Sequence, residues 1–265
     1  MPFDLKNKWV LITGASSGFG AAGAIAFGAQ GSKLLLGARR VDRLEQVAAE
    51  ARKAGASEAH VHALDVSKTK SVNEFIEWAK KTITQSLSPP ASLHVLINNA
   101  GGALGLDTVA GGKDEDWETM MQTNVLGVLR MTRAALPLMP REAGASIINI
   151  GSHADRAPYE GGSAYCGVKA AAAQITRVLR LELCGTGIRV SLIAPGLAET
   201  EFSLVRFKGE IARAKKPYEG TFPLVGEDIA EAMVWVASRP PHVNIDEMVV
   251  KPTDQAAMHK VYRRK

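Results

Sequence analysis

The sequence predicts an α/β fold: a single doubly wound domain in which helices cover both faces of a parallel sheet of about seven strands. Two observations carry this prediction. Short, almost unbroken apolar runs recur along the 265 residues, and longer segments with helical spacing of apolar residues separate them. Unbroken apolar runs of strand length are typical of strands buried on both faces, and their alternation with helices favours right-handed parallel crossovers.

The elements can be placed along the chain in order. The strand-like runs are residues 9–13, 33–36, 60–64, 94–97, 147–150, 189–193 and 248–250. The helical segments are residues 21–30, 41–54, 68–86, 114–139, 164–184 and 227–238. Residues 86–92, with Pro89 and Pro90, are expected to form a loop because proline cannot continue a helix. No repeat or composition shift marks a second domain, so we expect one domain over residues 1–265.

The composition is that of an ordinary globular protein. Apolar residues make up 46% and charged residues 22% of the chain, and no apolar run approaches the roughly 20 residues of a membrane span. The N-terminal residues lack the apolar core of a signal peptide. The two cysteines, Cys166 and Cys184, are too few for a disulfide framework, so we expect free thiols and a cytoplasmic location.

The net charge of +5 would suit an anionic partner, but basic residues are spread along the chain except at residues 262–265. A nucleic-acid interface would need a basic stripe interleaved with aromatic residues. We therefore expect neither a nucleic-acid nor a membrane partner, and assign the charge to an anionic cofactor or substrate. The histidines have no zinc-ligand spacing, so we expect no metal site.

A glycine-rich turn follows the first predicted strand. It consists of Thr13, Gly14, Ala15, Ser16, Ser17, Gly18, Phe19 and Gly20. Gly14 permits a tight turn, Gly18 lets the backbone approach a pyrophosphate, and Gly20 lets the next helix pack near the strand. The N-terminus of that helix attracts phosphates. The turn therefore predicts a Rossmann-type dinucleotide site, which Ser16, Ser17 and Phe19 also line.

The end of the second predicted strand indicates which dinucleotide binds. An NAD site has an acidic residue here for the ribose hydroxyls, whereas this chain has Ala38, Arg39 and Arg40. Two guanidinium groups with no carboxylate beside them suit a 2′-phosphate. We therefore predict NADP(H) as the cofactor; the alternative is that both arginines are solvated at a strand end or begin the next helix.

Further cofactor contacts are expected where the third and fourth predicted strands end. Asp65, followed by Val66, would accept a hydrogen bond from the adenine amino group or cap the helix that begins near residue 68. The fourth strand ends in two asparagines, whose side chains can tie neighbouring loops to the sheet. From this segment we expect the cofactor to be lined by Asn98, Ala100 and Gly101.

Three side chains form a candidate catalytic set. Tyr165 and Lys169 are four residues apart in a helical segment and so share one face. A tyrosine that acts as a base near neutrality needs its pKa lowered from about 10 to about 7, and a nearby ammonium is the obvious source. Ser152 comes just after the fifth predicted strand, where its hydroxyl would polarise a substrate oxygen.

These motifs, in this order, resemble the short-chain dehydrogenase/reductase family over essentially the whole chain. The matching positions are residues 13–20, 98–101, Asn124, Ser152, Tyr165 with Lys169, and residues 195–196. The resemblance implies that Tyr165 exchanges the proton, Lys169 lowers its pKa and binds the nicotinamide ribose, and Ser152 steadies the reacting oxygen. It also implies that Asn124 holds a water in the proton relay.

The resemblance continues after the sixth predicted strand. Pro195 and Gly196 match the cofactor-lining pattern, and Thr200 matches the threonine that contacts the nicotinamide carboxamide, with a helix cap as the alternative. About residues 200–220 would form a substrate lid. Residues 116–118, 199–209 and 252–256 are similar to the NADP-dependent serine and 3-hydroxy acid dehydrogenases, although His153 stands where that subgroup has a small or aliphatic residue.

The resemblance thus implies an NADP(H)-dependent oxidoreductase that moves a hydride between nicotinamide and a small hydroxy acid or the matching carbonyl. Two alternatives stay open: a reductase of a sulfonated or other small aldehyde, such as sulfoacetaldehyde, and a catalytically silent dinucleotide-binding regulator. Arg206 is expected to bind the anionic group of a substrate held between Ser152 and Tyr165, or else to be a solvated lid residue. The resemblance also implies a homodimer or homotetramer.

Overall fold

The computed structural model describes residues 2–86, 92–141 and 144–264, and its strands form one parallel sheet. The strands are β1 (Trp9–Thr13), β2 (Lys33–Ala38), β3 (Glu58–Ala63), β4 (Leu93–Asn98), β5 (Ser146–Ile150), β6 (Arg189–Pro195) and β7 (Glu247–Val250). Their spatial order is β3-β2-β1-β4-β5-β6-β7, and every neighbouring pair is parallel. The order reverses between β1 and β4, the kind of position where open α/β sheets bind ligands.

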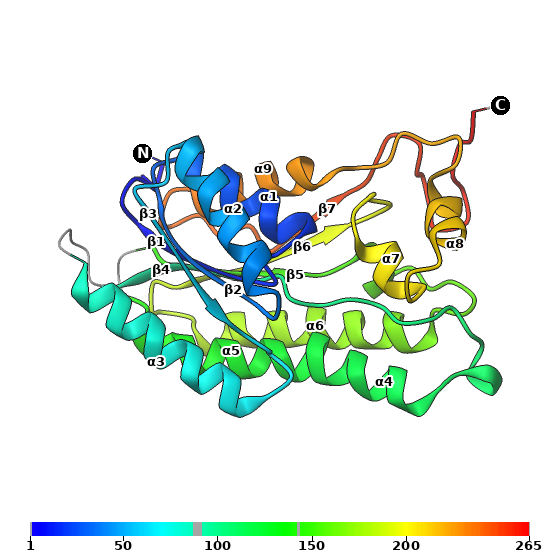
Figure 1. Ribbon diagram of the computed structural model, residues 1–265, viewed down its shortest axis with the longest axis horizontal. Helices are drawn as coiled ribbons and strands as arrows, with labels where there is room; N and C mark the ends of the chain where they lie inside the picture. The colour runs from blue at the N-terminus through cyan, green and yellow to red at the C-terminus, as the bar shows by residue number, and fades with distance from the viewer. Residues whose placement is uncertain (1, 87–91, 142–143, 265) are drawn as a thin grey trace.

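Helices cover both faces of this sheet (Figure 1). On one face lie α1 (Gly18–Ala29), α2 (Val41–Ala54) and α9 (Gly226–Ala237). On the other lie α3 (Thr69–Gln85), α4 (Asp114–Met121), α5 (Gly127–Ala135) and α6 (Ser163–Glu182). Each face has its own apolar cluster, and the predicted fold class is confirmed. Residues 87–91 of the predicted 86–92 loop lie outside the described residues.

The burial of the strands explains why they could be recognised in the sequence as apolar runs. Every residue of β1, β2, β4, β5 and β6 is buried, whereas the two outermost strands, β3 and β7, are partly exposed. Inner strands need apolar side chains on both faces because helices pack there on both sides. Among the described residues, no helix combines the length and the apolar character needed to cross a membrane.

The segment predicted as one helix over 114–139 is interrupted. A π-helical turn at Gln122–Leu126 separates α4 from α5. Asn124 Nδ2 donates to the carbonyl of Met120 at 2.9 Å, an acceptor that a regular α-helix would reserve for the Asn124 backbone N–H. The competition widens the helix locally and keeps Asn124 buried beneath the sheet edge.

Between β6 and α9 the chain leaves the sheet and forms two short helices, α7 (Phe202–Arg206) and α8 (Ile211–Lys215) (Figure 1). The C-terminal tail runs back to this segment, where the backbone N–H of Arg264 donates to the Gly220 carbonyl at 2.6 Å. The Arg264 guanidinium also pairs with Asp254. The far end of the segment is therefore tied to the tail.

Candidate active site

A cavity of about 580 Å³ opens at the carboxyl ends of the central strands, at the switch point. Five segments line it: the glycine-rich turn, the end of β2, residues 64–67, residues 99–104, and the chain around Thr200. Tyr165 and Lys169 line its inner part. The nucleotide and catalytic motifs, which are far apart in the sequence, thus share one cavity.

The glycine-rich turn has the shape of a phosphate cradle. Gly14 and Gly18 have φ of +65° and +53°, a region that favours glycine. A Cβ on Gly14 would lie 2.9 Å from the Ala100 Cα, and one on Gly20 would lie 2.5 Å from the Gly14 carbonyl oxygen. Larger residues would not fit here, and the backbone N–H groups at the start of α1 stay available for a pyrophosphate. These residues fit a dinucleotide.

Arg39 and Arg40 lie at the outer end of the cavity and differ in their contacts. Arg39 is exposed and makes no side-chain hydrogen bond or ion pair within residues 2–86, 92–141 and 144–264. Arg40 donates from Nη2 to Ser17 Oγ at 2.8 Å and to Ser16 Oγ at 3.3 Å, and its Nη1 lies 3.0 Å from the Glu201 carboxylate. Both guanidinium groups can therefore reach a phosphate at the cavity mouth.

Sequence analysis missed two residues of this cluster. Arg43, in the first turn of α2, pairs with the same Glu201 carboxylate. A basic residue three positions after Arg40 follows the helical period and could have been noticed. Glu201, however, is 161 positions after Arg40, and no local pattern connects it with α2.

Some of the other expected cofactor residues line the cavity, and others do not. Asp65 and Val66 line the cavity; the Asp65 carboxylate accepts from Ser67 N at 3.0 Å and Ser67 Oγ at 2.7 Å, so it shapes the turn before α3 and does not cap the helix. Ala100 and Gly101 line the cavity as expected. A free oxygen, Oδ2, leaves Asp65 able to meet an adenine amino group.

Asn98 corrects the sequence interpretation, because it lies below the cavity. Its Nδ2 donates to Thr132 Oγ1 at 3.0 Å and to Asn149 Oδ1 at 2.8 Å. The last residue of β4 points into the interior, whereas Asn99 faces the turn and binds the Thr13 carbonyl at 2.9 Å. Alternation along the strand separates the two asparagines.

Pro195 and Gly196 also lie outside the cavity lining. A Cβ on Gly196 would lie 2.3 Å from Gln255 Oε1, so this glycine makes room for the C-terminal tail. Thr200 does line the cavity and faces Gly18, and its Oγ1 accepts from the Phe202 backbone N–H at 3.2 Å. Thr200 therefore starts α7 and borders the cofactor cavity at the same time.

The catalytic candidates meet at the inner end. Ser152 lies close enough to the hydroxyl of Tyr165 to lower its pKa. Lys169 is buried, and its Nζ donates to the Ile150 carbonyl at 3.0 Å and lies 5.9 Å from the Tyr165 ring centre. Ser152 Oγ in turn accepts from Ala154 N at 3.1 Å, which fixes the start of the following turn. The three groups are held for proton transfer.

Both the nitrogen and the oxygen of the Asn124 side-chain amide form hydrogen bonds with the backbone. Its Nδ2 donates to the carbonyls of Gly102 and Met120, and its Oδ1 accepts from Gly102 N at 3.2 Å. A Cβ on Gly101 would lie 2.6 Å from Asn124 Oδ1 and 3.6 Å from Lys169 Nζ. Asn124 thus holds the loop that covers Lys169.

The expected lowering of the Tyr165 pKa is not present in the chain by itself. Burial raises the pKa of Tyr165 above its ordinary value, and the hydrogen bond with Ser152 partly offsets this shift. Burial also lowers the pKa of Lys169 to about 8, against the opposing effect of Asp155. The Lys169 ammonium donates to a backbone carbonyl and not to Tyr165. The effect of burial on both pKa values is therefore larger than the attraction between Lys169 and Tyr165.

The depressed pKa of Lys169 leads to a prediction about stability. Below pH 8 the folded chain carries a buried charge, and between pH 8 and about 10.5 the unfolded chain binds more protons, so stability rises with pH in this window. We expect Lys169→Met to be about 2 kcal/mol more stable than wild type at pH 7, after about 1 kcal/mol for the lost hydrogen bond to Ile150. Urea unfolding at pH 7 and pH 10 measures this. An advantage that does not shrink at pH 10 would contradict it.

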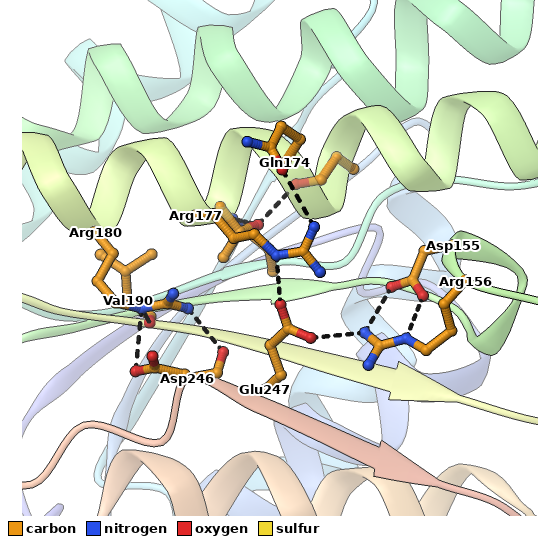
Figure 2. A network of polar contacts seen from close by, with 11 residues as sticks. Asp155, Arg156, Gln174, Arg177, Arg180, Val190, Asp246 and Glu247 are labelled. Carbon is orange, nitrogen blue, oxygen red and sulfur yellow. Dashed lines mark hydrogen bonds and ion pairs between the residues drawn. The ribbon is translucent and has the colours of Figure 1, made fainter.

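An ion-pair network braces the turn that follows Ser152 (Figure 2). Arg156 Nε lies 2.6 Å from the buried carboxylate of Asp155, and its Nη2 lies 2.9 Å from Glu247 of β7. Arg177 of α6 reaches the same Glu247 at 2.8 Å. The helix that carries Tyr165 and the turn that carries Ser152 are therefore fastened to one edge strand.

His153, whose role the sequence left open, lies within this braced turn. Burial lowers its pKa, as does the charge of Lys251, while Asp155 acts in the opposite direction. Its Nδ1 is buried without a hydrogen-bond partner among the described residues. A neutral imidazole at this position adds no charge beside Ser152.

Arg206 lies on the substrate side of Tyr165. Its Nε donates to the Gly105 carbonyl at 2.8 Å, and its guanidinium carbon lies 5.7 Å from the Tyr165 ring centre and 5.3 Å from that of Tyr159. Its Nη2 is buried and has no hydrogen-bond partner in the described part of the chain. Arg206 is thus not a solvated lid residue; it presents an unused donor beside the reacting tyrosine.

Comparison with known proteins defines the class. A family model described as short chain dehydrogenase matches residues 8–210. The chain therefore belongs to the short-chain dehydrogenase/reductase family, a class of oxidoreductases, and the predicted membership is confirmed.

Individual relatives are similar over nearly the whole chain. The chain is 42% identical to the NADP-dependent 3-hydroxy acid dehydrogenase of Schizosaccharomyces pombe over 98% of both proteins. It is 43% identical to a sulfoacetaldehyde reductase of Chromohalobacter salexigens over 93% of this chain and 94% of that one.

Solved structures agree with these relatives. The closed form of a serine dehydrogenase complexed with NADP⁺ superposes with a TM-score of 0.85 at 39% identity, covering 97% of this chain and 100% of that one. The serine dehydrogenase from Escherichia coli superposes with a TM-score of 0.75 at 35% identity, covering 94% and 99%.

Proposed function

We propose that this protein is an NADP(H)-dependent oxidoreductase that interconverts a small hydroxy acid, of the serine or 3-hydroxy acid type, and the matching carbonyl. The observation that carries the proposal is the cavity with two ends: arginines beside a phosphate cradle at one end, and Tyr165 with Lys169 at the other, where Arg206 lines a small adjoining pocket next to Tyr165. The NADP-dependent names of the relatives support the cofactor.

The pyrophosphate lies on the glycine-rich turn, Arg39 and Arg40 bind the 2′-phosphate, and Asp65 meets the adenine. Bound NADP(H) accepts or supplies the hydride at its nicotinamide ring. Thr200 and Lys169 hold the nicotinamide half, Lys169 through the ribose hydroxyls. These assignments follow from the positions of the residues around the cavity.

Proton transfer falls to the inner trio. Ser152 donates to the reacting oxygen and orients it, and Tyr165 takes the hydroxyl proton when the alcohol is oxidised or gives it back when the carbonyl is reduced. The positive charge of Lys169 favours the tyrosinate, which is the form of Tyr165 that takes the proton in oxidation and that remains after reduction. Because the Asn124 side chain is occupied by Gly102 and Met120, a relay water would use the Asn124 backbone carbonyl or the remaining lone pair of Oδ1.

Arg206 binds the acid group of the substrate through its unused Nη2, while its Nε stays on Gly105. This contact would place the reacting carbon between Ser152 and Tyr165. We expect Arg206→Ala to lower kcat/KM for 3-hydroxypropionate or serine by about 10- to 100-fold, the range of a charge-assisted hydrogen bond, with little effect on a neutral alcohol of similar size.

The matched control is Arg213→Ala, an exposed lid arginine paired with Glu210. It should leave both values unchanged. Equal losses on the acid and the neutral alcohol in Arg206→Ala would mean that Arg206 only shapes the lid.

A second candidate substrate is a small sulfonated aldehyde. The identity with the sulfoacetaldehyde reductase favours it, and a guanidinium binds a sulfonate in the same way as a carboxylate. Steady-state assays with NADPH on sulfoacetaldehyde and on the semialdehyde of a 3-hydroxy acid separate the two. Absence of turnover with every small carbonyl would instead favour the catalytically silent regulator.

Residues 1–265 act as one domain, and about residues 200–220 act as the substrate lid. The free cysteines support a cytoplasmic location. A homodimer or homotetramer, with the segments 114–139 and 164–184 packed between subunits, remains our expectation. Light scattering on the purified protein measures that state.

A further inference from the structure

One carboxylate at the cavity mouth is not needed by the proposed reaction. Glu201 stands between Thr200, which borders the cofactor cavity, and α7, the first helix of the lid. Its Oε2 lies 3.0 Å from Arg40 Nη1, and its Oε1 pairs with Arg43 Nη1. The lid is therefore joined at its first residue to the arginines at the end of β2.

The same arginines are the cationic groups that a 2′-phosphate would meet. Arg40 Nη2 is already used by the hydroxyls of Ser16 and Ser17, and Glu201 takes one donor of Nη1, so the second N–H of Nη1 and the Nε–H are the donors left for another anion. Arg43 adds a second donor to the same carboxylate. Glu201 thus contacts these guanidinium groups as a bound phosphate oxygen would.

A phosphate and this carboxylate would compete. Two anions within a few ångströms of one guanidinium repel each other, and the ion pair with Glu201 reduces the positive charge that Arg40 offers to a phosphate. The carboxylate is about one-third exposed, at 35%, so water can solvate it once it leaves the arginines. Breaking a partly exposed ion pair costs little free energy, because such pairs contribute little to stability.

We propose that Glu201 is an internal competitor for the 2′-phosphate of the cofactor: its carboxylate holds Arg40 and Arg43 until the phosphate displaces it, which frees the first turn of the lid. Glu201 is therefore a specificity-determining residue through which the lid senses the group that distinguishes NADP(H) from NAD(H). The proposal rests on the proposed placement of that phosphate at Arg39 and Arg40.

The remaining lid contacts limit what is released. Arg206 stays bound to Gly105, Lys208 Nζ lies 2.8 Å from Asp116 of α4, and the C-terminal tail holds Gly220. Displacement of Glu201 therefore loosens the lid at its N-terminal end and leaves the substrate side attached.

Binding of two nucleotides tests the competition. Adenosine 2′,5′-bisphosphate and 5′-AMP differ only in the 2′-phosphate, and neither reaches the nicotinamide site. By calorimetry, we expect Glu201→Gln to bind the bisphosphate about fivefold more tightly than wild type and 5′-AMP equally well, since the lost competition is worth two partly exposed ion pairs. Glu199→Gln, an exposed carboxylate two residues earlier, is the matched control and should match wild type.

Hydrogen exchange in α7 tests the release, and cleavage of the lid by trypsin is its control. Lys208, Arg213 and Lys215 are exposed in the lid. These sites lie at or beyond the contacts of Arg206 and Lys208, so cleavage there should not respond to the bisphosphate, whereas we expect the bisphosphate, but not 5′-AMP, to speed hydrogen exchange of the α7 backbone N–H groups about threefold in wild type. Glu201→Gln should exchange at the faster rate without ligand and should not respond further.

The outcomes separate two failures. Unchanged or weaker bisphosphate binding in Glu201→Gln, or hydrogen exchange of α7 in wild type that the bisphosphate does not accelerate, would overturn the role of Glu201 and leave the arginine site intact. If wild type bound the bisphosphate no more tightly than 5′-AMP, the placement of the 2′-phosphate would itself be wrong, and this proposal would fall with it.

Discussion

Tyr165→Phe is expected to reduce kcat about a thousandfold while leaving NADPH binding nearly unchanged. The substitution removes only the hydroxyl that Ser152 contacts and that exchanges the proton, and general acid–base catalysis of this kind contributes about 10²- to 10⁴-fold. The ring keeps its edge contact with Phe202 at 5.5 Å and its place beside Lys169 and Arg206, so the fold should be retained.

The measurement pairs steady-state kinetics with fluorescence titration of NADPH. Tyr262→Phe, at an exposed tyrosine near the C-terminus, is the matched control and should turn over normally. Activity of Tyr165→Phe within about tenfold of wild type would assign the proton transfer to another group.

The second large effect concerns the cofactor. Replacing Arg39 and Arg40 together by alanine should lower kcat/KM for NADPH by about 10²- to 10⁴-fold, since each charge-assisted hydrogen bond to the phosphate is worth about 1.5–3 kcal/mol. The value for NADH should fall far less, only by what Arg40 contributes through Ser16 and Ser17. Wild type should therefore prefer NADPH strongly, and the double variant should have almost no preference.

The single variants separate two roles. Arg39 is exposed and makes no side-chain hydrogen bond or ion pair among the described residues, so Arg39→Ala removes the phosphate interaction alone. Arg40→Ala also frees Ser16 and Ser17 of the glycine-rich turn and should cost some NADH activity as well. Lys53→Ala, exposed in the last turn of α2, serves as the control. Equal use of NADPH and NADH by wild type would refute the assignment.

Local patterns predicted much of the site. The glycine-rich turn, the arginines after β2 and the pair Tyr165 and Lys169 all depend on short spacings, and the structure brings them to one cavity. Their common position follows from topology, because the carboxyl ends of parallel strands lie at one edge of the sheet.

Other features could not be predicted locally. Whether Asn98 or Asn99 faces the cavity depends on the phase of β4 against its neighbours, and the interruption of the 114–139 helix depends on a side-chain competition at Asn124. The predicted lowering of the Tyr165 pKa was wrong for the chain without cofactor. The spacing of Tyr165 and Lys169 shows that the two residues are near each other but not how deeply Tyr165 is buried.

The sequence by itself determined the doubly wound sheet, the order of its elements and the membership of the family, because periodicity, turn chemistry and short motifs act over a few residues. Only the tertiary structure decided which charges meet. Glu201 pairs with Arg40 and Arg43 from 161 and 158 positions away, and Arg206 is carried to the face of Tyr165 with one donor unused. Such contacts depend on how the lid packs across the sheet edge, and burial there sets their strength.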